Sequence, residues 1–555
     1  MSSRNPLDVD LRRLLGTGAK LAGRAADEAY FARVCFRAGV FEIESPQRLA
    51  RIVHSIERHG LLASSIAIGA IRQPDRVAIR DERGDVTFRE LHGRINALAN
   101  AWRARGVRAG DGITILVRNH RGFLEALFAG VLCGARVILL NTSFAGPQIR
   151  DVAEREGTDL LVYDDEFGEM LAGVQPRYGR FRAWVDDDAT DPAESLDALI
   201  AGASTDSPPK AERHAKLVIL TSGTTGAPKG APRDEPRSLA IVGGLLSRVP
   251  LRARECTVLA TPMFHTLGLA GMALGLALGS TLVIHRRFDP EVTLDALADN
   301  RATALIVVPV MLQRIVDLGL DAISSTDLRA LRVIVASGSA LGPALVTRAT
   351  GVFGPVVYNL YGSTEIAQAT IATPDDLALD PGTVGRPVRG TVVKIFGEDG
   401  RELPAGESGR IFVGNYAQFE GYSGGGSKDQ LEGLMSSGDV GHFDERGLLF
   451  IDGRDDEMIV SGGENVFPAE VEELLAGHEA IVEAAAIGVA DERFGQRLKA
   501  FVVLHGGRRL SADEVRQYVR DNLATYKVPR DVVFVDELPR NPTGKVLKRE
   551  LAARD

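Results

Sequence analysis

A short apolar run leads directly into a loop of hydroxyl groups, glycines and one lysine. The run covers residues 217–220, and the loop residues are Thr221, Ser222, Gly223, Thr224, Thr225, Gly226 and Lys229. Glycines leave backbone N–H groups accessible, while the hydroxyl and ammonium groups add donors and a positive charge. The pattern therefore predicts a phosphate-binding loop. A classical P-loop is not expected, because Gly226 is not followed directly by Lys and Ser or Thr.

The alternative for this segment is a flexible surface loop rich in Ser, Thr and Gly. Such a loop needs neither a lysine nor the stiffening residue Pro228. Only ten of the 65 basic residues in the chain are lysines, so Arg is its usual surface cation. A lysine inside a glycine-rich loop therefore favours a specific role for the compact ammonium charge.

The loop resembles the signature of the acyl-adenylate-forming superfamily, which includes acyl-CoA synthetases, adenylation domains and firefly luciferase. Seven further segments are similar to motifs of that family and occur in its order: residues 262–265, 337–340, 361–365, 437–439, 453–456, 462–468 and 539–545. The resemblance extends from about residue 66 to the C-terminus. One such motif is moderately specific, whereas the ordered set is highly specific.

The resemblance implies that ATP binds with Mg²⁺ at a site built from several of these segments. Adenine and ribose contacts fall on Gly338, Ser339, Tyr361, Gly362, Thr364, Asp439 and Arg454. The residue types agree with those roles, because a Tyr ring can stack on adenine, a carboxylate accepts from ribose hydroxyls and a guanidinium donates to ribose or phosphate oxygen. Glu365 offers the hard oxygen ligand that Mg²⁺ prefers.

Lys545 corresponds to the C-terminal catalytic lysine of the family. A carboxylate substrate is already ionised near pH 7, so its attack on the α-phosphate of ATP needs positioning and charge neutralisation rather than a general base. Lys545 can supply that positive charge, while the loop containing Lys229 holds the leaving pyrophosphate. The alternative is an ordinary solvated lysine, as Lys527 or Lys548 would be.

The resemblance also implies a second half-reaction, in which coenzyme A displaces AMP. The C-terminal domain is expected to rotate about Asp456 between the two half-reactions. The coenzyme A face would then be formed by Ser461, Gly462, Gly463 and Glu464. A hinge must absorb a large change in φ and ψ.

His265 corresponds to a residue that lines or gates the carboxylate pocket, although a lone His beside apolar residues is usually a buried core residue. The small residues Gly268, Gly271, Ala273, Gly275 and Gly279 follow it. They permit either a channel for an alkyl chain or close helix packing.

The identity of the acid is read from the same segment. Amino-acid-activating relatives commonly carry an acidic residue where this chain has His265, so a carboxylate without an amino group is favoured. The sequence as a whole resembles bacterial fatty-acyl-CoA synthetases of medium- to long-chain preference. The alternatives are an aryl-CoA ligase, a fatty-acyl-AMP ligase that serves a carrier protein, and an inactive lipid- or nucleotide-binding homologue.

Short apolar runs that alternate with amphipathic helices must position these residues. Such runs at 112–117, 136–140, 160–163, 217–220, 305–308 and 333–336 predict parallel strands with crossover helices. The expected class is α/β, with a large domain of doubly wound mixed sheets, a small antiparallel β subdomain and a small mobile α+β C-terminal domain. We place a helical N-terminal extension at 1–65, the large domain at 66–453, a hinge at 454–457 and the C-terminal domain at 458–555.

Composition narrows the functional classes. The 555 residues carry a net charge of -9, which gives no general attraction to nucleic acid. Three distant cysteines and the absence of a secretory signal favour the cytoplasm. Basic amphipathic segments in residues 1–65 permit peripheral membrane contact, although packing on the protein's own body is commoner. Residues 267–284 are apolar and rich in glycine, and we expect a buried helix and a strand rather than a membrane span.

Overall fold

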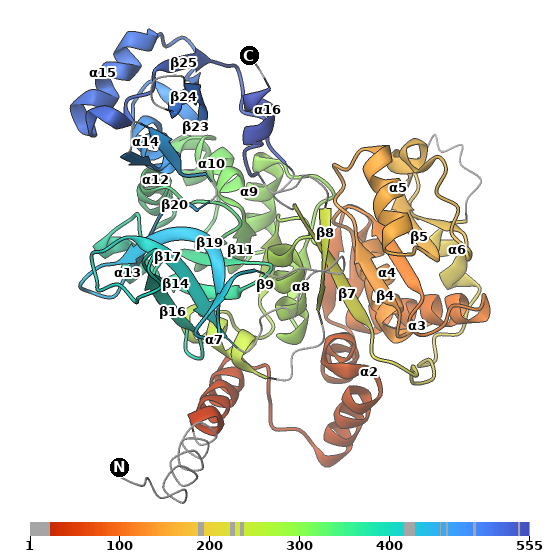
Figure 1. The fold of residues 1–555 in the computed structure, drawn as a ribbon. Coiled ribbons are helices and arrows are strands. Elements are labelled where there is room, and N and C mark those ends of the chain that lie inside the picture. Colours follow the sequence, from red (N-terminus) through yellow and green to blue (C-terminus); the bar gives the residue numbers. More distant parts are fainter. Residues whose placement is uncertain are drawn as a thin grey trace, which may run out of the picture.

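The computed structural model describes residues 23–186, 194–222, 228–233, 238–415, 428–455, 457–461, 464–491, 495–541 and 544–553. Two large sheets with helices packed against them form the main body, and a small sheet lies beside them (Figure 1). The C-terminal unit lies above this body in the view of Figure 1. The fold class predicted from the sequence is confirmed.

The larger sheet has nine strands in the order β15-β14-β13-β12-β11-β9-β10-β1-β2. The strands are β1 Val77–Asp81, β2 Gly84–Thr87, β9 Cys256–Leu259, β10 Thr281–Val283, β11 Ala304–Val307, β12 Val333–Ala336, β13 Val357–Ser363, β14 Ala367–Ala372 and β15 Arg386–Pro387. Neighbours from β13 to β1 are parallel, and β2, β14 and β15 pair antiparallel at the edges. The carboxyl ends of the parallel strands therefore meet at one edge of the sheet.

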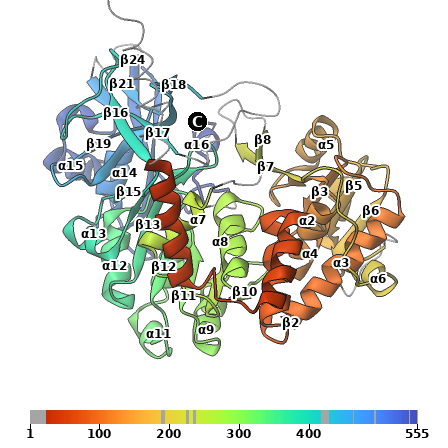
Figure 2. The ribbon, with the colours of Figure 1, turned by 90° about the horizontal axis from the view of Figure 1, so that it is seen from below.

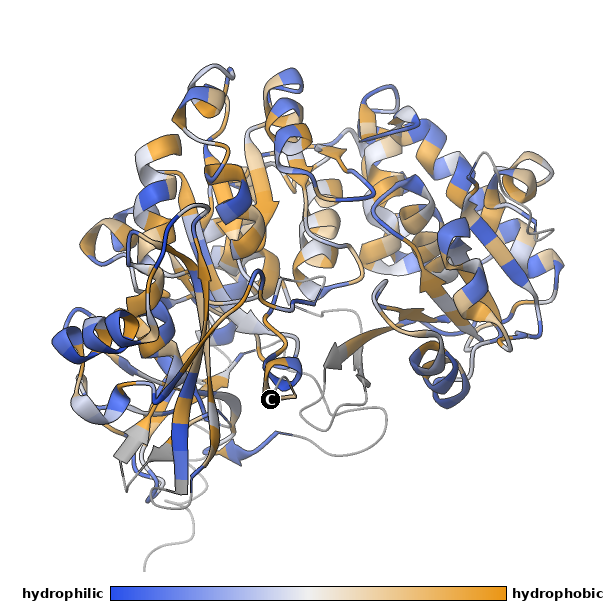
Figure 3. Cartoon of the chain, turned by 90° about the horizontal axis from the view of Figure 1, so that it is seen from above, coloured by the Kyte–Doolittle hydropathy of each residue, from blue (hydrophilic) through white to orange (hydrophobic). Residues whose placement is uncertain are grey.

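The second large sheet has six strands in the order β6-β5-β3-β4-β7-β8. The strands are β3 Gly112–Leu116, β4 Arg136–Leu139, β5 Leu160–Asp164, β6 Arg180–Trp184, β7 Lys216–Ser222 and β8 Pro228–Arg233. All pairs are parallel except β7 with β8. Every apolar run that predicted a strand forms one, because strands covered on both faces are uniformly apolar. Figure 3 shows this hydrophobic character in the sheets and alternating character in the outer helices.

Helices cover both sheets, as the alternating pattern predicted. They are α3 Phe88–Ala104, α4 Arg121–Leu132, α5 Gly146–Arg155, α6 Leu196–Ala201, α7 Ala240–Arg248, α8 Thr266–Ala277, α9 Pro290–Asp299, α10 Pro309–Val316, α11 Leu320–Ser324, α12 Pro343–Phe353 and α13 Pro374–Leu379, with a 3₁₀ helix at Asp165–Leu171. The apolar stretch at 267–284 forms α8 and β10, as expected. Within the described parts of the chain, no helix has the length and apolar character needed to cross a membrane.

A small antiparallel sheet follows the two large ones. Its strands are β16 Val392–Phe396, β17 Gly409–Gly414, β18 Gln430–Leu431, β19 Leu434–Phe443 and β20 Leu449–Arg454. β19 pairs with β17, β18 and β20, so it is the central strand. The small antiparallel β subdomain expected from the sequence is therefore present.

The C-terminal unit is a five-stranded sheet with helices. It contains β21 Ile459–Ser461, β22 Glu464–Val466, β23 Ile481–Asp491, β24 Gly495–Leu504 and β25 Asp531–Phe534, with α14 Pro468–Ala476, α15 Ala512–Asn522, α16 Lys548–Ala552 and a 3₁₀ turn at Thr525–Lys527. Ser511 caps α15, since its side chain accepts from the Glu514 N–H.

The described part of the N-terminal extension is helical. Residues 23–38 form one helix, and α2 spans Pro46–Arg72. Phe31 and Cys35 are fully buried, so the first helix packs on the protein's own body. α2 lies between α8 and α3 (Figure 2). It bends at Gly60, where φ is 81°, and it passes residue 65 without a break.

Candidate active site

The parallel strands β9, β11, β12 and β13 deliver their following residues to one edge of the large sheet. Val307 pairs with Ala336, and Ala336 pairs with Asn359, so β11 and β12 end level with Asn359 of β13. Gly338 follows β12, Tyr361 lies in β13, and His265 lies in the segment after β9. Residues more than 90 positions apart in the sequence are thereby brought to the same edge, which is where ligands bind in open α/β sheets.

Tyr361, Asp439 and Arg454 form a hydrogen-bonded cluster at this edge. The Tyr361 hydroxyl donates to Asp439 Oδ2 at 2.5 Å, and Arg454 Nη1 donates to Asp439 Oδ1 at 3.0 Å. Asp439 and Arg454 are direct partners between β19 and β20, which explains their proximity. Burial and the neighbouring Asp439 raise the pKa of Tyr361 well above its ordinary value. The phenol therefore stays protonated and continues to donate to the carboxylate.

The turn before Asp439 is shaped by Ser437 and Gly438. Ser437 Oγ accepts from the Asp439 N–H at 3.1 Å and donates to the Ile411 carbonyl at 3.1 Å. Gly438 has a φ of 83°, and a Cβ there would lie 3.0 Å from Lys428 Nζ. Lys428 also donates to the Ser437 carbonyl at 3.3 Å. The sequence reasoning did not select Lys428, although the scarcity of lysine in this chain was an available signal.

Glu365 lies in the turn after β13 and is 9% exposed. Ser363 Oγ donates to Glu365 Oε2 at 2.9 Å, and Thr364 shares a hydrogen bond of 2.8 Å with Thr266 at the start of α8. Across the described residues, no group of three or more His, Cys, Asp or Glu side chains is arranged to hold a metal ion. One carboxylate nevertheless fits Mg²⁺ in a nucleotide site, because nucleotide-bound Mg²⁺ is usually held by one or two carboxylates together with phosphates.

Gly362 is required by the hairpin between β13 and β14. A Cβ at this position would lie 2.0 Å from the Ala367 carbonyl oxygen. The strand pairing shifts register between Tyr361 and Gly362. The glycine therefore allows the close backbone approach at the irregular pairing of this hairpin.

His265 lies at the N-cap of α8, where its segment is held by a buried asparagine. Asn119 Nδ2 donates to the Thr261 carbonyl at 2.8 Å, and the Met263 N–H donates to Asn119 Oδ1 at 2.8 Å. His265 Nε2 is buried and has no hydrogen-bond partner within the described chain. Asn119 is thus a positioning residue that sequence reasoning missed, because its partners are 142 and 144 positions away.

The imidazole of His265 should remain neutral throughout the physiological range. Burial disfavours the charged form and lowers the pKa of His265 from 6.5 to about 4. We expect its ring proton resonances, assigned with a His265→Gln variant, to stay unchanged between pH 8 and pH 5.5. The urea-unfolded protein is the control, since its histidines should titrate near pH 6.5. A step near pH 6.5 in the folded protein would contradict the assignment of a neutral, buried ring.

The glycines of α8 serve close packing. A Cβ at Gly268 would lie 2.2 Å from the Pro262 carbonyl oxygen, one at Gly271 2.6 Å from Ile306 Cδ1, and one at Gly275 2.5 Å from Leu282 Cδ2. The space that these glycines leave is already filled by neighbouring residues. Of the two sequence interpretations, the structure therefore supports helix packing and gives no channel along this face.

The loop that carries Lys545 reaches the large domain through Gly544. Gly544 has a φ of 78°, and a Cβ there would lie 2.2 Å from Val310 Cγ1 and 3.5 Å from Val308 Cγ2. Val308 also lies 3.3 Å from the position of a Cβ at Gly338. Asn541 Oδ1 accepts from the Lys545 N–H at 2.9 Å, and the Lys545 side chain is exposed. The lysine loop therefore lies beside the Gly338 turn.

Replacing Gly544 with Ala should lower, by roughly tenfold, the rate of the adenylate formation that the resemblance implies. The methyl group would collide with Val310, and a positive φ costs a non-glycine residue on the order of 1–3 kcal/mol. Pyrophosphate release measures this half-reaction. Gly507→Ala is the matched control, because Gly507 has a φ of 79° but no atom within 4 Å of the added Cβ. Equal effects of both variants would show that the Val310 contact does not matter.

Parts of three predicted segments lie outside the described residues: Gly223, Thr224, Thr225 and Gly226 of the phosphate loop, Asp456, and Gly462 with Gly463. The backbone on either side is described. β7 and β8 pair Thr221 with Lys229 and Ser222 with Pro228, so the predicted loop connects two antiparallel strands. Ser461 pairs with Glu464 between β21 and β22.

Comparisons with known proteins agree with this arrangement. Residues 68–423 match the protein family described as "AMP-binding enzyme", and residues 470–545 match the family described as "AMP-binding enzyme C-terminal domain". An indoleacetate–CoA ligase of Aromatoleum aromaticum is 33% identical, over 87% of this chain and 96% of its own. A fatty acid–[acyl-carrier-protein] ligase of Streptomyces coeruleorubidus is 30% identical, over 89% and 96%.

A solved structure of a CoA synthetase is similar to this chain over most of its length. The o-succinylbenzoate CoA synthetase of Bacillus subtilis, in complex with its acyl-adenylate intermediate, superimposes with a TM-score of 0.76 and 27% identity. The match covers 88% of this chain and 98% of that one. The first family description alone spans well over half of the 555 residues. The chain therefore belongs to the AMP-binding enzyme family, the adenylate-forming superfamily that its motifs resemble.

Proposed function

We propose that the protein is an AMP-forming CoA ligase that activates an apolar carboxylic acid and transfers the acyl group to coenzyme A. ATP, Mg²⁺ and coenzyme A are the partners of the acid in this reaction. The observation that carries the proposal is the contact of Gly544 with Val310 and Val308, which places the Lys545 loop beside the Gly338 turn. A site for adenylate formation needs this positive charge near the nucleotide.

In the first half-reaction, a carboxylate oxygen of the acid forms a bond to the α-phosphorus of ATP, and the bond to the pyrophosphate oxygen breaks. Asp439 and Arg454 hold the ribose, with the carboxylate oriented in advance by Tyr361. Glu365 would hold Mg²⁺, which neutralises phosphate charge when bound. Lys545 would stabilise the charge that develops between the carboxylate and the α-phosphate.

In the second half-reaction, the sulfur of coenzyme A bonds to the acyl carbon, AMP leaves, and the thiol proton passes to solvent. We propose that the C-terminal unit rotates about Asp456 to bring the face of Ser461, Gly462, Gly463 and Glu464 to the site. Because proline fixes φ, Asp456→Pro should slow at least one half-reaction by more than roughly tenfold. Asp456→Ala is the control, because alanine leaves φ free to change, and this variant should react normally. Asp455→Pro would not serve, because proline would also remove the hydrogen bond that the Asp455 N–H donates to the Gly438 carbonyl. Wild-type rates for both half-reactions in Asp456→Pro would argue against rotation at this residue.

The neutral environment of His265 favours an acid without an amino group. An ammonium substituent would need a carboxylate partner at this position, whereas a buried imidazole with a pKa of about 4 carries no negative charge. The apolar residues Met263, Phe264 and Leu269 beside it are buried. These features support an apolar acid.

A medium- or long-chain fatty acid is the first candidate, on the resemblance of the sequence to fatty-acyl-CoA synthetases. An aryl-substituted acid is the second, and two observations favour it. The space beside the α8 glycines is occupied by neighbouring residues, so it leaves no channel for an alkyl chain there. One similar protein is an indoleacetate–CoA ligase. The carrier-protein ligase from Streptomyces coeruleorubidus keeps a third possibility open for the acceptor, namely a carrier protein in place of coenzyme A.

The deciding experiment is a panel of acids from acetate to palmitate, with benzoate, indoleacetate and amino acids, scored for pyrophosphate and for acyl-CoA. Acids that give both products support the CoA ligase and identify its substrate class. Pyrophosphate without acyl-CoA would indicate a carrier-protein acceptor. Turnover of no acid, with ATP still bound, would replace the proposal with the inactive homologue.

We further propose that the protein acts in the cytoplasm with peripheral membrane contact through its N-terminal region. Ile43, Leu49, Val53 and Leu61 support this contact, because they are large apolar residues exposed by 90%, 51%, 43% and 50%. Flotation with vesicles tests it: a variant with Ser at these four positions should float less than the wild type.

A further inference from the structure

A cleft between α2 and α3 lies away from the nucleotide site. Its volume is about 310 Å³, at the lower end of the range for small-ligand sites, roughly 300–1,000 Å³. Six basic side chains line it: Arg51, His54, Arg58, His59, Arg89 and His92. α2 lies on the side of the large domain opposite the C-terminal unit, so the cleft shares no residue with the active site (Figure 1).

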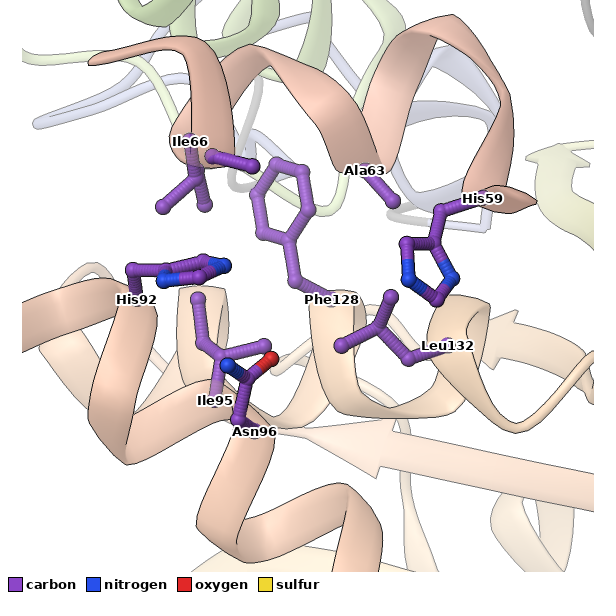
Figure 4. Close-up of a pocket in the computed structure, with 9 residues that line it drawn as sticks. His59, Ala63, Ile66, His92, Ile95, Asn96, Phe128 and Leu132 are labelled. Atoms are coloured by element: carbon purple, nitrogen blue, oxygen red, sulfur yellow. The ribbon is translucent and has the colours of Figure 1, made fainter. Parts of the chain in front are cut away.

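The bend of α2 produces the shape of the cleft. Gly60 interrupts the helix with a φ of 81° and a ψ of 176°, so the segment containing Arg51, His54 and Arg58 diverges from the segment that packs on α3. A second, smaller cavity shares His59, Ala67 and His92 with the cleft, and its volume of about 10 Å³ has room for about one water molecule. Figure 4 shows this smaller cavity, in which His59 from the bend and His92 from α3 lie on either side of Phe128.

No acidic side chain in the lining compensates the positive charge of the arginines in the cleft. Arg58 donates through Nε and Nη2 to the Pro208 carbonyl at 3.2 and 3.0 Å, which fixes its guanidinium without neutralising it. Arg89 pairs with Asp75 at 3.0 Å, but the two side chains are 65% and 85% exposed, so the pair is screened by solvent.

Two histidines of the lining have lowered pKa values, mainly through burial and to a smaller extent through the neighbouring basic groups. Burial, followed by Arg58, His92 and His54, lowers the pKa of His59 from 6.5 to about 4. Burial and Arg51 also lower the pKa of His92. His59 Nε2 lies 3.1 Å from Ser207 Oγ. Neutral imidazoles, a hydroxyl and several guanidinium groups around one concave space form a set of donors suited to a phosphate group.

We propose that this α2–α3 cleft is a second anion site, which binds the phosphate group of either a small phosphorylated ligand or a phospholipid headgroup. Guanidinium groups bind phosphate through two parallel hydrogen bonds, and an anion would relieve the repulsion among the basic groups. The site lies beside the exposed apolar residues Leu49 and Val53 of the same helix. It is independent of the acid and nucleotide proposed above.

Inorganic phosphate is the probe for the soluble source. Calorimetric titration, with the nucleotide site saturated by AMP and chloride adjusted to constant ionic strength, should detect binding to the wild type. Arg51→Ala should weaken it by roughly tenfold, the value of one charge-assisted contact. Arg48→Ala is the matched control, because Arg48 is an exposed arginine of the same helix that does not line the cleft. Phosphate binding that is insensitive to Arg51→Ala, or absent, would overturn the proposal.

Vesicles distinguish the lipid source. Sedimentation with phosphatidylcholine vesicles, with and without phosphatidate, should depend on Arg51 and not on Arg48 if the cleft holds a headgroup. Equal losses in both variants would indicate general surface attraction and would overturn the headgroup alternative. Arg89→Ala provides a second, largely exposed variant in case Arg51→Ala is unstable. Both cleft variants should retain normal acyl-CoA formation, which checks that they are folded.

Discussion

Lys545→Ala is expected to lower the rate of adenylate formation by about 10²- to 10³-fold, while thioester formation from a supplied acyl-adenylate changes little. The lysine loop lies against Val308 and Val310, and its ammonium group would face the charge that develops at the α-phosphate. Removal of one group that stabilises such a charge typically costs this factor. Pyrophosphate release measures the first half-reaction, and acyl-adenylate with coenzyme A measures the second.

Lys527→Ala is the matched control for this variant. Lys527 belongs to the same C-terminal unit but forms an ion pair with Glu470. It should leave both half-reactions nearly unchanged. If Lys545→Ala and Lys527→Ala behave alike, or if Lys545→Ala slows only the thioester step, the proposed role of Lys545 at the α-phosphate is wrong.

Asp439→Ala should lower kcat/KM for ATP by roughly 100-fold or more. Each hydrogen bond to a charged group contributes about 1.5–3 kcal/mol, and the carboxylate is expected to accept from two ribose hydroxyls. The variant also leaves Tyr361 and Arg454 without their common acceptor. Steady-state kinetics with ATP as the varied substrate provides the measurement.

Tyr361→Phe separates the two contributions. It removes only the hydroxyl that orients Asp439 Oδ2 and leaves both the carboxylate and the aromatic ring. We expect a loss of about tenfold or less, in keeping with one hydrogen bond. A loss equal to that of Asp439→Ala would mean that the carboxylate acts only through the phenol and does not contact ribose.

Much of this architecture could be predicted from local patterns. The apolar runs at 305–308 and 333–336 form β11 and β12, because a strand buried on both faces requires such a run. The order of the motifs then located Tyr361, Asp439 and Arg454, which the structure brings into direct contact. The strand predictions succeeded because each rests on residues that are close in sequence, whereas the roles of the three motif residues at a nucleotide stay predictions.

Contacts between distant segments could not be predicted from the sequence. Nothing near Asn119 indicates that its amide holds the Thr261 segment, 142 positions away. The α8 glycines permitted two interpretations, and only the neighbouring side chains Ile306 and Leu282 decide between them. The bend at Gly60 was equally hidden, since a glycine within a helical pattern often leaves the helix straight.

The hydrogen bond between Thr266 and Thr364 joins the proposed acid pocket to the proposed nucleotide site. Thr266 begins α8 directly after His265, and Thr364 directly precedes Glu365. A ligand that shifts either segment therefore changes the free energy of the other. By thermodynamic reciprocity, any factor by which the acid tightens Mg-ATP binding is also the factor by which Mg-ATP tightens acid binding. An acid of the wrong shape would then be rejected partly through weakened ATP binding, before any ATP is consumed.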